Sequence, residues 1–175
     1  MLLTLDEVRQ EALGNVDGNF YNLFNKFQRA GNQESLANEI IDDLLCRGIG
    51  DELIPVFVDL VLSAREDVAN HSIVRLLNSE VEPVISDHVV WRLEGSNRKE
   101  FIPLIERLLR KSTNSSTKVR CLHTLFFFDD NSVTDIIASV KHDPTPVPDY
   151  HATVGQIASN LLREKLNKIS SGKVH

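Results

Sequence analysis

The stretch KVRCLHTLFFFDDNSVTDIIASVKHDPTP, residues 118–146, contains two apolar segments separated by a polar turn. Apolar side chains recur at helical spacing from Val119 onward, and a run of three phenylalanines, 126–128, ends the first segment. Asp129–Ser132 then supplies residues that favour turns and helix N-termini. The second segment repeats the helical spacing before a proline-rich loop. The stretch therefore predicts a helical hairpin with the phenylalanines in its core. The alternative is that one of the last two phenylalanines is exposed and inserts into a partner.

The rest of the chain continues this helical pattern, with Gly, Asn, Ser and Asp between the segments and no strand-like alternation. We predict helices at 4–13, 18–30, 34–47, 51–65, 67–78, 83–94, 98–112, 117–128, 132–141 and 150–168. The loop His142–Asp149 carries three prolines, which exclude a helix and predict a rigid connector.

Two of the predicted helices repeat each other. ELIPVFVDLVL (52–62) and EFIPLIERLLR (100–110) align at an offset of 48 residues, with a proline in the first turn of each. Repetition at about this period is typical of stacked helical hairpins. The segment 51–65 has almost no polar face, which predicts a helix buried in an inner layer.

The hairpin at 118–146 resembles a HEAT-like repeat. Val119-Arg120 opens a first helix, Asp129-Asp130 forms the turn, Ile136-Ile137 lies in the second helix and Asp143 closes the unit. The resemblance implies an all-α fold, a short right-handed α-solenoid of stacked antiparallel hairpins. We expect one domain over 1–175, with capping helices at 1–33, repeats at 34–165 and a tail at 166–175.

Composition is ordinary for a soluble globular protein, with 175 residues, 42% hydrophobic and 25% charged. No apolar run approaches the ~20 residues that span a bilayer, and the acidic N-terminus does not read as a secretory signal. Cys46 and Cys121 fit no metal or redox motif. We expect two reduced, buried thiols in a cytoplasmic protein.

Charge is distributed unevenly along the chain. Residues 1–95 carry 17 acidic and 7 basic side chains, a net charge of −10, whereas residues 96–175 carry 8 and 12, a net charge of +4. An acidic first half disfavours nucleic acid and favours a cationic protein partner. The alternative is that the charge only keeps the protein soluble.

Acidic side chains of the first half are the predicted docking surface. Glu39, Asp42 and Asp43 share one side of the predicted helix 34–47, opposite its apolar stripe. Trp91 is the predicted apolar anchor, and the alternative is that it lies in the core. The full predicted set is Glu39, Asp42, Asp43, Asp51, Glu52, Asp59, Glu80, Glu82, Asp87 and Trp91.

Signals for catalysis are weak, because the chain has no phosphate loop, GxSxG or HExxH. We therefore predict no enzyme and no cofactor. His142, Asp143, Asp149 and His151 could in principle hold a divalent ion, but solvated loop residues are the preferred interpretation. A basic cluster from Arg98 to Arg120 includes acids and few aromatics, so we predict no nucleic-acid partner.

In size, acidity and helical character the chain resembles immunity proteins of bacterial contact-dependent growth inhibition systems. That resemblance implies a monomer that binds the cationic surface of a cognate toxin domain one to one, often a basic nuclease, and covers its active site. Two alternatives remain: a general HEAT-like adaptor in a larger assembly, and a HEAT-like enzyme of lyase or DNA glycosylase type.

Overall fold

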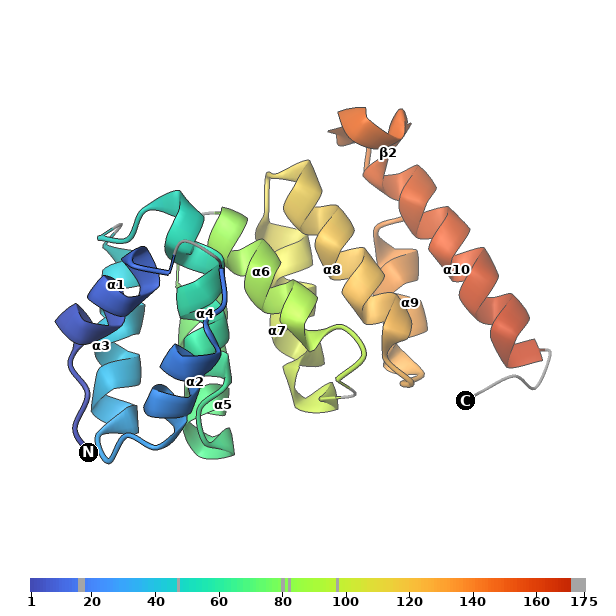
Figure 1. Ribbon diagram of the computed structural model, residues 1–175. Coiled ribbons are helices and arrows are strands. Elements are labelled where there is room, and N and C mark those ends of the chain that lie inside the picture. The colour runs from blue at the N-terminus through green and yellow to red at the C-terminus, as the bar shows by residue number, and fades with distance from the viewer. Residues whose placement is uncertain (16–17, 47, 80, 82, 97, 171–175) are drawn as a thin grey trace. The chain divides into compact units, whose positions relative to one another are not determined.

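Helices make up most of the part of the chain that the computed structural model describes, which is residues 1–15, 18–46, 48–79, 81, 83–96 and 98–170 (Figure 1). The helices are α1 (Leu5–Leu13), α2 (Tyr21–Gln28), α3 (Gln33–Leu45), α4 (Ile54–Leu62), α5 (Glu66–Asn78), α6 (Pro83–Leu93), α7 (Ile102–Lys111), α8 (Ser115–Phe127), α9 (Ser132–Ser139) and α10 (Val154–Ser170). Each overlaps one predicted range, so the all-α prediction is confirmed.

The chain divides into two compact units, Met1–Val89 and Val90–His175, and the division falls within α6. In the first unit α1 packs on α2 and α3, and α3, α4 and α5 pack on one another. In the second unit α8 packs on α7, α9 and α10, and α9 also packs on α10. Helices that follow one another in sequence therefore form much of each unit's packing, as expected for helical hairpins.

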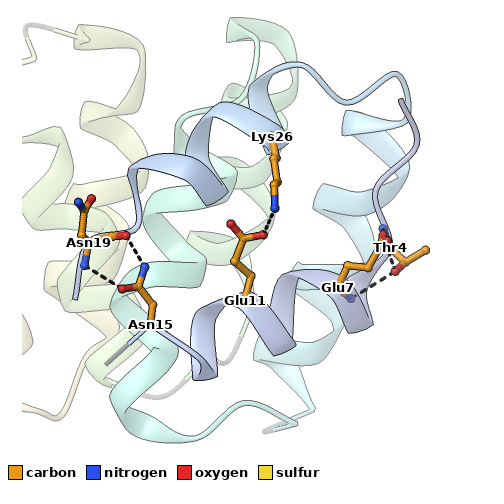
Figure 2. Close-up of polar contacts among 6 residues, drawn as sticks. All are labelled: Thr4, Glu7, Glu11, Asn15, Asn19 and Lys26. Atoms are coloured by element: carbon orange, nitrogen blue, oxygen red, sulfur yellow. Dashed lines mark hydrogen bonds and ion pairs between the residues drawn. The ribbon is translucent and has the colours of Figure 1, made fainter. Parts of the chain in front are cut away.

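The N-terminal helix is fixed by a capping box. Thr4 accepts a hydrogen bond from the Glu7 backbone N–H, while the Glu7 carboxylate accepts one from the Thr4 backbone N–H at 2.8 Å (Figure 2). Figure 2 also shows Lys26 of α2 reaching Glu11 of α1, with Nζ and Oε2 2.5 Å apart. The capping box thus fixes the residue at which α1 begins, and an exposed ion pair links α1 to α2.

The repeated sequence segments 52–62 and 100–110 also share a local structure. A 3₁₀ turn, η1 (Asp51–Leu53), leads into α4, and a second one, η2 (Lys99–Phe101), leads into α7. Pro55 and Pro103 stand in the first turns of these two helices, where a missing N–H costs no hydrogen bond. The two segments differ in burial: α4 buries five of its nine residues, whereas α7 buries a narrow stripe.

The phenylalanine triplet is divided between core and surface. Phe126 and Phe128 are buried, but Phe127 is 53% exposed, so the expectation that all three lie in the core is wrong for Phe127. Three residues in a row cannot all face inward at the end of one helix. Lys165 of α10 donates hydrogen bonds of 2.8 Å from Nζ to the carbonyl oxygens of Phe126 and Phe128. These two carbonyls at the C-terminal end of α8 thereby gain a hydrogen-bond donor.

The proline-rich loop is an ordered hairpin rather than a plain connector. Strand β1 (Pro146–Val147) pairs antiparallel with β2 (Ala152–Thr153), and a 3₁₀ turn, η3 (Pro148–Tyr150), lies between them. The prediction of no strands is corrected here. Because β2 occupies residues predicted to be helical, α10 begins at Val154 rather than 150.

The C-terminal end of α10 also differs from the prediction. The helix continues to Ser170, so the expected tail at 166–175 is helical over its first five residues, and residues 171–175 lie outside the described chain. Both cysteines are free, as expected, but only Cys121 is buried, because Cys46 sits at the exposed end of α3. Within the described ranges, no helix combines the length and the apolar character needed to cross a bilayer.

Candidate functional site

Helix α3 positions three of the predicted docking carboxylates. Its buried stripe includes Ile40 and Leu44, which face the core of the first unit. Glu39, Asp42 and Asp43 are not on that stripe, because successive residues of a helix point in different directions around its axis. Glu39 and Asp42 are exposed, whereas Asp43 is half-buried.

Arginines from neighbouring helices bind two of these carboxylates. Arg9 of α1 pairs with Asp43, with Nε 3.1 Å from Oδ2, and this hydrogen bond raises the pKa of Arg9 above its ordinary value. Arg75 of α5 pairs with Asp42 and also donates to Asn38 at 3.2 Å. These pairs tie α3 to α1 and α5, so Asp42 and Asp43 are partly neutralised from within the protein.

The 3₁₀ turn η1 presents two further acids to solvent. Asp51 and Glu52 are both exposed, and neither side chain has a hydrogen-bond or ion-pair partner in the described chain. Glu39 is also exposed, and within the described residues its carboxylate accepts one hydrogen bond, of 3.3 Å, from the Ser35 hydroxyl. Among the described acids of the predicted set, Glu39, Asp51 and Glu52 are therefore exposed carboxylates without a cationic partner.

Two further predicted acids are less accessible. Asp59 was expected to meet solvent on α4, but it is half-buried and its Oδ1 lies 2.9 Å from Nε2 of His88. Asp87 of α6 is half-buried as well. Glu80 and Glu82 lie outside the described residues. The described acids of the predicted set therefore differ: some are open to a partner and others are partly buried or paired within the fold.

Trp91 belongs to the second unit, whereas the predicted acids belong to the first. Its side chain is 45% exposed, with the Arg92 guanidinium 5.7 Å from the ring centroid. The alternative that Trp91 is a core residue is therefore wrong. Phe127 is the other large aromatic side chain of α6–α8 that is exposed, so both Trp91 and Phe127 are accessible to a partner.

A hollow that the sequence did not reveal lies between α3 and α5. It has a volume of about 230 Å³, and its lining includes Glu34, Asp67 and His71. Glu34 and Asp67 are exposed, and Asp67 also lies 3.6 Å from Arg65. The sequence shows both acids but not that helix packing brings them together. The i, i+4 spacing of Asp67 and His71 was the one available signal.

Some basic side chains of the second unit are engaged in ion pairs. Arg110 binds Glu106 at 2.8 Å, and Lys118 binds Asp143 at 2.7 Å. Burial raises the pKa of Asp143, but hydrogen bonds from Lys118 and Thr145 outweigh it and hold that pKa below its ordinary value. These pairs reduce the positive charge that the basic cluster offers to a phosphate backbone.

The Asp143 pairing also bears on the loop considered for a metal ion. Its carboxylate is already bound by Lys118 and Thr145. Among the residues that the structure describes, no three His, Cys, Asp or Glu side chains are arranged to hold a metal ion.

Comparison with known proteins gives no relative: no protein-family model, no curated protein and no solved structure matches the chain. The HEAT-like and immunity resemblances therefore remain predictions from the sequence.

Proposed function

We propose that this chain is a protein-binding module that neutralises a cognate bacterial toxin by binding the toxin's cationic surface and covering its active site. In this proposal the helical hairpins form a short right-handed HEAT-like α-solenoid, and the protein acts as a cytoplasmic monomer in a one-to-one complex. The packing of consecutive helices and the repeated 3₁₀–proline helix starts support the repeat architecture.

The observation that carries the proposal is the set of unpaired carboxylates in the first unit. Glu39, Asp51 and Glu52 are exposed and have no cationic partner in the described chain. The strongly negative net charge of the first half adds a field that speeds encounter with a basic protein. Charges of this kind speed association and fix the register of the complex, and reversing their sign adds like-charge repulsion that weakens binding.

Affinity in such a complex comes from desolvated apolar anchors. The second unit offers Trp91 and Phe127, both with about half of their surface exposed. The hollow between α3 and α5 would receive a lysine or arginine side chain, since Glu34 and Asp67 line it. A cation enclosed there gains more from each carboxylate than it would in bulk water.

The proposal predicts a specific gene arrangement and a specific phenotype. The gene should lie directly downstream of one that encodes a large secreted toxin. Co-expression of this chain with the C-terminal domain of that toxin should restore the growth of bacteria that the domain alone kills. The immunity role would be refuted if the upstream gene encodes no toxin. It would also be refuted if the toxin domain still kills cells in which this chain is expressed in soluble form.

Charge reversal then tests the site. The variant Glu39→Lys/Asp51→Lys/Glu52→Lys changes exposed residues that hold no ion pair, so it should fold normally and lose protection. Reversing Asp42, Asp43 or Asp59 is a poorer test, because each is bound to Arg75, Arg9 or His88 and reversal would disturb the fold itself.

A matched control comes from the second unit. Asp129 and Asp135 are exposed and hold no ion pair within the described residues. The variant Asp129→Lys/Asp135→Lys should leave protection unchanged, because it adds positive charge outside the proposed surface. Equal loss of protection in both variants would show that net charge, rather than the proposed surface, matters.

A further inference from the structure

A separate cavity of about 210 Å³ lies in the second unit, between one face of α8 and the tip of the β1–β2 hairpin. Its lining includes Val119, Arg120 and His123 of α8 on one side and Pro148 and Tyr150 of the hairpin on the other. The docking proposal uses none of these residues. The cavity is smaller than the sites that hold drug-sized molecules.

The hairpin tip is held in place over α8. Val147 of β1 is buried, and β1 packs directly on α8. Prolines at 144, 146 and 148 restrict the loop, and His151 closes the 3₁₀ turn with a positive φ of 47°. The two walls of the cavity are therefore set by the fold before any ligand arrives.

Two of the residues that line the cavity carry polar groups without a partner in the described chain. The Nε2 atom of His123 is buried without a hydrogen-bond partner in the described chain. Arg120 is half-buried, and within the same ranges its guanidinium makes neither an ion pair nor a hydrogen bond. The two residues are three apart on one helix, so they lie on the same face. A buried imidazole nitrogen is costly to leave unbonded, and a half-buried guanidinium without a protein partner is available to a ligand.

Two acidic side chains from other elements also line the cavity. Glu94, which follows α6, and Asp149, in η3, both line it, and neither carboxylate has an ion-pair partner among the described residues. The Tyr150 ring lies beside them, with its centroid 6.4 Å from that of His123. Carboxylates next to an exposed aromatic ring favour an ammonium group.

We propose that this cavity binds a free α-amino acid. The ligand carboxylate would bind Arg120 through its planar fork of donors, next to His123 on the same face of α8. The ligand ammonium would bind Glu94 and Asp149 against the Tyr150 ring. The two kinds of charge in one small cavity match the carboxylate and the ammonium that every α-amino acid carries on its α-carbon.

Nuclear magnetic resonance titration of the full-length protein tests this assignment. Each of the twenty common α-amino acids is added separately up to about 10 mM, a range that detects weak binding. At least one should shift the signals of Arg120, His123 and Tyr150 and saturate them. The best ligand is then compared with its decarboxylated amine and its deaminated acid, and each should bind about tenfold or more weakly because one charged contact is lost.

Variants locate the two charges of the ligand. Arg120→Met and Glu94→Gln should each weaken binding of that amino acid about tenfold or more, while Arg163→Met, which removes an exposed arginine of α10, should not. If Arg120→Met lowers the melting temperature, Arg120→Gln replaces it. The proposal is overturned if no amino acid shifts the three signals, if the amine or the acid binds as tightly as the amino acid, or if the Arg120 variants bind normally.

Discussion

The ion pair between Arg9 and Asp43 determines how charge changes on α3 should be interpreted. We predict that Asp43→Asn destabilises the protein, although it keeps the shape of the side chain. The substitution removes the charge that Arg9 contacts through both Nε and Nη2. It would also loosen the attachment of α1 to α3, because this pair joins the two helices.

The size of the effect follows from exposure. Fully exposed pairs contribute about 0–1 kcal/mol, whereas breaking a buried pair costs about 3–5 kcal/mol. The Arg9 side chain is 35% exposed and that of Asp43 is 13% exposed. The pair lies between the two cases, so we expect a loss of about 2 kcal/mol. For a chain of this length that corresponds to a fall of about 4–8 °C in Tm.

Urea denaturation followed by circular dichroism gives the free energy of unfolding. Arg9→Met, Asp43→Asn and the double variant complete a cycle that isolates the coupling between the two side chains. Glu39→Gln is the matched control on the same helix, and we expect it to change stability by less than about 0.5 kcal/mol because Glu39 has no ion pair. An Asp43→Asn protein as stable as this control would refute the reasoning.

Three further predictions concern the second unit. Lys165→Met should lower stability by about 2–3 kcal/mol in urea denaturation, because two carbonyls at the end of α8 lose a charged donor; an unchanged midpoint would contradict this. Because the Asp143 pKa is lowered in the folded protein, its contribution is fully present above pH 3.8 and lost as pH falls through the lowered pKa. Acid titration of stability should show this loss in the wild type and a weaker loss in Asp143→Asn; parallel curves would count against it. Gly155→Ala should lower the Tm measured by calorimetry, because a Cβ there would lie 2.6 Å from the Lys141 carbonyl oxygen. An unaltered Tm would contradict this, because the backbone at Lys141 would then have moved away without a cost in stability.

Helix positions were predictable because local periodicity determines them. The apolar stripe of α3 and the proline in the first turn of α4 are visible in the sequence and need no tertiary information. The hairpin of β1 and β2 was not predictable in the same way. Two-residue strands carry no alternation to detect, and the prolines around them indicate only that a helix is excluded.

The candidate site was less predictable because pairing across helices depends on tertiary packing. Asp42, Asp43 and Glu39 look equivalent in the sequence, yet arginines 33 and 34 residues away bind the first two. The spacing of such residues along the chain gives no sign that they meet. Exposure at a helix end is also a tertiary property, which is why Phe127 was expected in the core and lies on the surface.

The most direct test of the docking surface is the affinity of the Glu39→Lys/Asp51→Lys/Glu52→Lys variant for the toxin domain encoded by the neighbouring gene. Calorimetric titration at low and high salt would compare it with the wild type and with Asp129→Lys/Asp135→Lys. We predict at least about a tenfold loss of affinity at low salt, a smaller loss at high salt and no loss for the control. Equal affinity of all three proteins at low salt would contradict the proposal that these carboxylates bind a cationic partner.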